Sequence, residues 1–134
     1  MSEHKVTLEW KRDTEDFSYE SYTRDHVLVF EGGVRVPASA AHAYRGNPAH
    51  VNPEEALVAA LSSCHMLTFL AVAAKKQFVV DQYSDHAVGV LEKNQKGKLA
   101  ITRVILRPRI VFGGPTPPTP EQMTALHVKI EGQA

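Results

Sequence analysis

The 134-residue chain has one cysteine, Cys64, and no net charge, because 15 Lys and Arg balance 15 Asp and Glu. A single cysteine excludes a disulfide within the chain and agrees with a reducing compartment, so we expect a cytoplasmic protein. A net charge of zero gives no indication of a nucleic-acid partner or of a strongly acidic one. The first ten residues contain no apolar run, so we expect no secretory signal there.

Metal-ligand spacing is also missing from the sequence. The seven histidines form no close pair, and with one cysteine a zinc site is not expected. We therefore expect neither a metal nor another cofactor. The length is that of one domain that can bury a sizeable core, so we expect a single domain over residues 1–134.

The most apolar segment, residues 52–76, has the features of one long helix. Asn52 is a good N-cap, Pro53 suits the first helical position, and Glu54 suits the positive end of the helix dipole. The segment is long enough to raise the question of a membrane span, but its Ser, His, Thr and many Ala residues favour a core helix. We expect no membrane association.

A helix that is apolar on every side needs cover on every side. One small subunit with a few strands and a short second helix does not supply that much cover. We therefore expect a homodimer in which two central helices pack together.

Patterns of alternating and β-branched residues predict antiparallel strands on both sides of this helix. The strands are expected at residues 6–11, 26–30, 34–36, 78–93 and 99–112. A capping box at Thr119 predicts a last helix of about three turns. With only one crossover helix between the strand groups, the order predicts an α+β fold rather than α/β.

Residues 38–51 form a long stretch without a periodic pattern. Such stretches are uncommon in compact domains and are often functional. The alternative is a surface excursion that a partner subunit orders.

Cys64 lies in the middle of the apolar helix, where it is either inert filler or a protected nucleophile. Cysteine counting alone favours a buried, inert thiol, because free cysteine is among the most buried residue types. A charged helix start ten residues earlier and the cluster at residues 24–26 (Arg-Asp-His) favour the nucleophile. His65 is a poor base for Cys64, because adjacent helix residues do not face each other. We expect His65 to be a hydrogen-bonded core or interface histidine.

The segment NPEEALVAALSSCHML, residues 52–67, resembles the OsmC/Ohr family of osmotically inducible and organic hydroperoxide resistance proteins. Shorter similar pieces are YTRDH at 22–26, FEGG at 30–33 and YSDHAVG at 83–89. The resemblance covers nearly the whole chain. It implies an α+β fold with antiparallel sheets around a long buried central helix, in an intertwined homodimer with two active sites at the interface.

Members of this family include thiol-dependent peroxidases that reduce organic hydroperoxides to alcohols. By position, the resemblance implies Cys64 as the peroxidatic cysteine, Arg24 as the active-site arginine and Glu54 as the carboxylate that holds it. The chemistry agrees, because the thiolate is the nucleophile, a guanidinium favours it, and a carboxylate orients a guanidinium. The alternatives are a helix-start charge for Glu54 and a solvated strand-edge charge for Arg24.

Two features modify this expectation. The family usually carries a second cysteine near the last helix, but residues 126–134 contain none, so turnover would need an external thiol reductant. Glu54 and Cys64 are about 15 Å apart along a straight helix, so a shared site needs a bent helix or groups from two chains. We expect a one-cysteine peroxidase acting on organic hydroperoxides. The alternative is a non-catalytic dimeric binding or stress protein.

Overall fold

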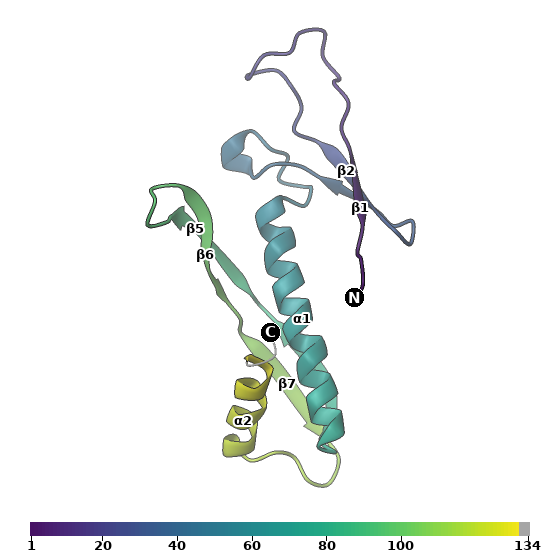
Figure 1. Ribbon diagram of the computed structural model, residues 1–134, viewed down its shortest axis with the longest axis vertical. Helices are drawn as coiled ribbons and strands as arrows, with labels where there is room; N and C mark the ends of the chain where they lie inside the picture. Colours follow the sequence, from purple (N-terminus) through teal and green to yellow (C-terminus); the bar gives the residue numbers. More distant parts are fainter. Residues whose placement is uncertain (132–134) are drawn as a thin grey trace. The chain divides into compact units, whose positions relative to one another are not determined.

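The computed structural model describes residues 1–131, which form two compact units, residues 1–56 and the residues from Leu57 onward. Strands, a long helix, more strands and a final helix follow one another along the chain (Figure 1). This order confirms the predicted α+β fold.

The first unit contains an antiparallel sheet in the order β1-β2-β3. Its strands are β1 (Val6–Glu9), β2 (His26–Phe30) and β3 (Arg35–Ala38). A tight hairpin turn joins β2 to β3, since the N–H of Gly33 donates to Phe30 O at 2.9 Å. Gly33 has a φ of 93°, a conformation that favours glycine. β1 ends two residues before its predicted end, because the indole of Trp10 turns to the loop before β2 and donates to Thr23 O at 2.8 Å.

Residues 38–51 are ordered by hydrogen bonds within the chain. Ser39 is fully buried; its hydroxyl oxygen accepts a bond from the N–H of Asn47 at 3.0 Å, and its own N–H donates to Val51 O at 2.9 Å. A short 3-10 helix, η1 (His42–Tyr44), lies within the loop. Gly46 packs so closely on the backbone of Ala40 that a Cβ would have no room. The chain itself therefore orders this loop.

Helix α1 (Pro53–Lys75) begins at Pro53 as predicted and ends one residue before the predicted end. At its start, Asn52 Oδ1 accepts a bond from the Glu55 N–H at 2.8 Å and Glu55 Oε1 accepts one from the Asn52 N–H at 3.1 Å, which is a capping box. At its end, Gln77 takes the left-handed conformation, with a φ of 65°. The N–H of Gln77 donates to Ala74 O and that of Phe78 to Ala73 O, which completes a Schellman motif without glycine.

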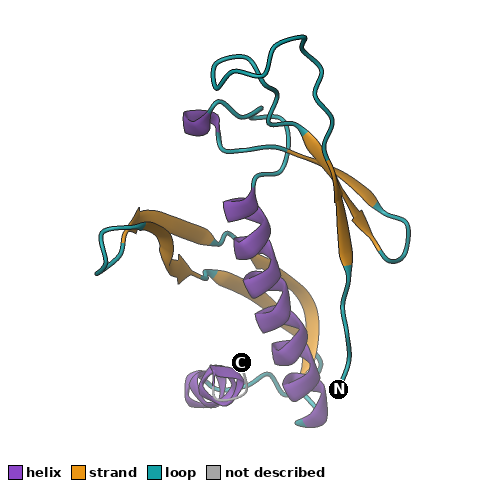
Figure 2. Cartoon of the chain, turned by 45° about the horizontal axis from the view of Figure 1, so that its top comes forward, coloured by secondary structure: helices purple, strands orange, loops and turns teal. Residues whose placement is uncertain are grey.

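The strands after α1 form two antiparallel pairs. β4 (Val79–Asp85) pairs with β7 (Pro108–Gly113), and β5 (Val88–Lys93) pairs with β6 (Leu99–Ile105) (Figure 2). The prediction of two unbroken strands over 78–93 and 99–112 is therefore wrong. Each predicted strand is interrupted, the first after Asp85 and the second before Pro108. The two interruptions face each other, because the N–H of Arg107 donates to Asp85 Oδ1 at 2.6 Å and Pro108 has no N–H to donate.

The core of the second unit lies between one side of α1, the β4–β7 pair and α2 (Pro120–Glu131). Phe69, Val72 and Ala73 of α1 are buried together with Leu126 of α2. The predicted capping box of α2 is confirmed by hydrogen bonds between Thr119 and Gln122 in both directions. Half-buried side chains complete this core: Leu70, Phe78, Val80, Tyr83, Ile110, Phe112 and Met123.

The other side of α1 is apolar and exposed. Leu57 and Leu61 are each 45% exposed and Leu67 is 60% exposed. By length and composition α1 could cross a membrane, with a mean hydropathy of 1.9, but the core helix of a soluble protein meets the same criterion. The described chain thus covers one side of α1 and leaves the other without cover.

Candidate functional site

Arg24 is held by the loop that joins β1 to β2. Its guanidinium lies 3.6 Å from the ring centroid of Tyr22 and 4.9 Å from that of Tyr19. It also donates hydrogen bonds to Tyr22 O at 2.5 Å and Tyr19 O at 2.7 Å. Two aromatic faces and two carbonyls therefore fix the planar cation, as suits an arginine better than a lysine.

Aromatic side chains gather around this arginine. The rings of Phe17 and Tyr22 lie 5.1 Å apart, and Trp10 lies 6.1 Å from Phe17 and 6.4 Å from Tyr22 in edge-on geometry. This cluster was not predicted. The signal for it is the concentration of four aromatic residues within residues 10–22, directly before Arg24.

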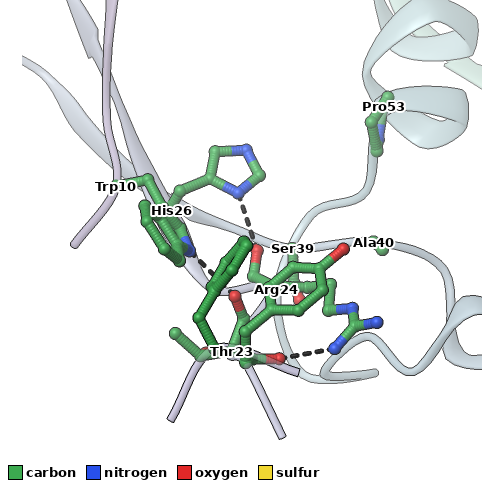
Figure 3. Close-up of a pocket in the computed structure, with 9 residues that line it drawn as sticks. Trp10, Thr23, Arg24, His26, Ser39, Ala40 and Pro53 are labelled. Carbon is green, nitrogen blue, oxygen red and sulfur yellow. Dashed lines mark hydrogen bonds between the residues drawn. The ribbon is translucent and has the colours of Figure 1, made fainter. Parts of the chain in front are cut away.

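A cavity of about 420 Å³ opens among these side chains. It is lined by Trp10, Phe17, Tyr22, Thr23, Arg24, His26, Ser39, Ala40 and Pro53, and we call it the Arg24 pocket (Figure 3). The imidazole Nδ1 of His26 lies 2.8 Å from Arg24 O, which ties β2 to the segment that carries the guanidinium. Apolar walls with a few polar groups are typical of a site for a small organic ligand.

Glu54 occupies the first turn of α1, next to the pocket-lining Pro53. Its Oε2 is buried and has no hydrogen-bond partner among the described residues. Within the same part of the chain, Glu54 forms no ion pair with Arg24, whose guanidinium is bonded to its own loop. Arg24 and Glu54 of the same chain are therefore not paired in the described residues. Their pairing across two subunits stays a prediction.

Cys64 is exposed, although its apolar segment led us to expect a buried thiol. Helical spacing places it on the same side of α1 as Leu57, Leu61 and Leu67, opposite the side that packs on the strands. α1 is one continuous helix from Pro53 to Lys75.

Ser62 and His65, on either side of Cys64 in the sequence, point to the packed side of α1. His65 Nε2 lies 3.2 Å from His127 Nδ1 of α2, and the two rings are stacked. The prediction of a hydrogen-bonded histidine is confirmed. Ser62 donates to Asp85 Oδ2 at 2.5 Å, a contact that the sequence did not predict.

Two further observations concern the ionisable side chains of the protein. Burial, with the negative charge of Asp85, raises the pKa of Tyr83 above its ordinary value of 10.0. Among residues 1–131, no three His, Cys, Asp or Glu side chains come together in a way that could hold a metal ion.

The family model described as OsmC-like protein matches residues 46–133, which is more than half of the chain. The chain belongs to the OsmC-like family. Cys64 and Glu54 of this OsmC-like protein lie within the matched residues, and Arg24 lies before them. The predicted family membership is confirmed.

Solved structures agree with this assignment. An OsmC-like protein of unknown function from Vibrio cholerae is 47% identical, with 99% of this chain and 90% of that chain covered and a TM-score of 0.94. An organic hydroperoxide resistance protein from Elizabethkingia anophelis, with thiocyanate bound, is 16% identical over 99% and 84% of the two chains, with a TM-score of 0.72. OhrB of Bacillus subtilis is 16% identical over 98% and 85%, with a TM-score of 0.64.

The last two proteins show the fold of the OsmC-like protein and not its activity, because their identity to it is low. The Vibrio cholerae protein is of unknown function. No match is found among the curated proteins.

Proposed function

We propose that this OsmC-like protein is a thiol-dependent peroxidase that reduces organic hydroperoxides to alcohols through Cys64. The observation that carries the proposal is the exposed thiol on the apolar, uncovered side of α1. A cysteine that served only as core filler would be buried among the side chains it packs against. Two bacterial proteins with the same fold are named organic hydroperoxide resistance proteins, which agrees with the proposal.

The reaction consists of two balanced steps. The Cys64 thiolate attacks the outer oxygen of the hydroperoxide, the O–O bond breaks as an S–O bond forms, and the departing alkoxide takes a proton to give the alcohol. Cys64 is then a sulfenic acid. Two external thiols reduce it, giving back the Cys64 thiol together with one disulfide and one water. The external reductant is needed because the chain offers no second cysteine.

Arg24 and Glu54 complete this proposed site in a homodimer. The guanidinium of Arg24 stabilises the thiolate, and Glu54 orients the guanidinium through a charge-assisted pair. The buried Oε2 of Glu54, which lacks a partner among the described residues, supports a pair that forms only on assembly. The Arg24 pocket supplies apolar walls for the organic group of the substrate. Residues 1–134 then act as one OsmC-like domain in each subunit.

A stoichiometric pulse of cumene hydroperoxide followed by mass spectrometry tests the proposal. We expect Cys64 to gain one oxygen atom, a dithiol such as reduced lipoamide to remove it, and Cys64→Ser to abolish peroxide consumption. Hydrogen peroxide should react more slowly, because it has no apolar group for the pocket. Cys64 that stays an unmodified thiol while the peroxide persists would overturn the proposal.

One observation favours a second function, that of a non-catalytic dimeric binding protein. The Arg24 pocket is complete within residues 1–56 and does not need Cys64 for its lining. Saturable binding of an apolar anion that Trp10→Ala weakens, in a protein whose Cys64 does not react with peroxide, would establish this alternative.

A further inference from the structure

The rotation of α1 about its own axis is not determined by hydrophobic burial alone. An amphipathic helix sets its rotation because its polar side must meet water. α1 is apolar on both sides, with Phe69 and Val72 buried in the core and Leu67 exposed on the opposite side, about 160° and 140° around the helix from them. A rotated helix would bury similar apolar surface, so something directional has to select the observed orientation.

Two side chains in the middle of α1, on its packed side, make hydrogen-bond contacts with other elements. Ser62 donates to Asp85 Oδ2 at 2.5 Å, and His65 is joined to His127 through ring nitrogens 3.2 Å apart. Ser62 and His65 are three residues apart, so they lie on one face of the helix. The two contacts therefore hold the same face of α1 at two successive turns.

Asp85 is itself held in place. While its Oδ2 accepts the bond from Ser62, its Oδ1 accepts one from the N–H of Arg107 at 2.6 Å. Asp85 is the last residue of β4, and Arg107 lies where β6 and β7 separate. One carboxylate thus links α1 to the point where both strand pairs break. A hydrogen bond to a charged group is stronger than one between neutral groups, so this link is the firmer of the two.

The thiol lies opposite these contacts. At 100° per residue, Cys64 is about 160° around the helix from Ser62 and about 100° from His65. Holding Ser62 and His65 inward therefore turns Cys64 outward, which is where it is found.

We propose that Asp85 and His127, acting through Ser62 and His65, fix the rotation of α1 and so direct the Cys64 thiol to the exposed side of the helix. Asp85 is the principal positioning residue. The effect of these residues on peroxide reduction rests on the function proposed above, but their effect on the orientation of Cys64 does not.

Ser62→Ala tests the link, and Ser63→Ala is its matched control. Ser63 is exposed and makes no side-chain hydrogen bond among the described residues. We expect Ser62→Ala and Asp85→Asn to lower the rate of Cys64 oxidation by cumene hydroperoxide about tenfold, the value of one hydrogen bond to a charged group. KM should stay unchanged, because neither side chain touches the substrate. Ser63→Ala should keep the wild-type rate.

Ser62→Thr is the decisive variant, because it restores the hydroxyl donor. We expect it to recover most of the lost rate. Equal rates for Ser62→Ala and Ser63→Ala, or no recovery by Ser62→Thr in a folded protein, would overturn the proposal.

A second measurement separates this inference from the proposed function. If wild-type Cys64 does not react with peroxide, the proposed function fails, and the alkylation rate of Cys64 by iodoacetamide then reports its orientation. Ser62→Ala should change that rate and Ser63→Ala should not. Faster hydrogen exchange at the Arg107 N–H in Asp85→Ala would show directly that the link has opened. An unchanged alkylation rate with unchanged exchange at Arg107 would overturn it.

Discussion

Arg24 and Glu54 illustrate how much of the site depends on single residues. The guanidinium of Arg24 is held by Tyr19 and Tyr22, while Oε2 of Glu54 is buried without a partner in the described chain. A cation held by neutral groups and an unpaired carboxylate oxygen have complementary charges, so we predict that the two form an ion pair. The physical expectation is that assembly brings them together, because a buried charge without a partner is costly.

The coupling of these two residues can be measured. We expect Arg24→Ala and Glu54→Gln each to lower kcat/KM, and the double variant to be little worse than either, because Glu54 acts through Arg24. Glu55→Gln is the matched control: it removes the same charge but keeps the capping box with Asn52, so activity should not change. Fully additive losses would show that the two residues do not share a site.

Tyr83 supports a prediction about stability and pH. Its hydroxyl is buried without a hydrogen-bond partner among the described residues, and burial with the charge of Asp85 raises the pKa of Tyr83. We expect Tyr83→Phe to leave the free energy of unfolding unchanged or to raise it by up to about 1 kcal/mol, because the substitution removes an unsatisfied group. A loss of more than about 1 kcal/mol would show that the hydroxyl finds a partner in the assembled protein.

The pH dependence follows from the same shift in the pKa of Tyr83. Because the folded state favours the neutral phenol, this contribution to stability is fully present below the pKa of an unfolded tyrosine, about 10. It is lost as the pH rises through the higher, folded pKa. Urea denaturation of wild type and Tyr83→Phe at neutral pH and above pH 10 measures the difference. A wild type that loses no more stability than the variant in alkali would contradict it.

At the scale of the elements, Gly89 of β5 lies against Val58 of α1. A Cβ added to Gly89 of β5 would lie 2.4 Å from Cγ2 of Val58 on α1. We expect Gly89→Ala to lower the free energy of unfolding by about 1–3 kcal/mol, because overpacking forces a side chain off its rotamer or shifts the backbone. Gly32→Ala, where a Cβ would meet nothing within 4 Å, is the control.

A compensating substitution identifies the cause. The double variant Gly89→Ala with Val58→Ala should lose less than the sum of the two single losses, because the smaller side chain at 58 makes room for the new methyl group. Denaturant midpoints of the four proteins measure this. If the losses of the two single variants simply add in the double variant, the destabilisation by Gly89→Ala does not come from the contact with Val58.

For the whole molecule, we predict an obligate homodimer. The exposed side of α1 carries Leu57, Leu61 and Leu67, and a continuous apolar surface of this kind marks an interaction site. The interface should be hydrophobic and bury about 2,000 Å² or more in total. Leu61→Glu should dissociate the dimer or prevent folding, and sedimentation is the measurement. A folded wild-type monomer that persists at micromolar concentration would contradict the prediction.

The sequence by itself determined those features of this protein that depend on interactions between residues close together in the chain. The start of α1, its N-cap at Asn52 and the turn at Gly33 depend on residues a few positions apart, so their pattern is visible along the chain. The same holds for the family resemblance, because the residues from Asn52 to Leu67 stand together in one segment.

Only the tertiary structure decided the features that join distant residues. The strands break at Asp85 because its carboxylate accepts the N–H of Arg107, 22 residues away, and no periodic pattern records that bond. The partners of Arg24 and the side of α1 that Cys64 occupies depend likewise on which surfaces meet. When a helix is apolar on every side, its sequence does not predict which side will be buried. Burying either side removes a similar apolar area from water.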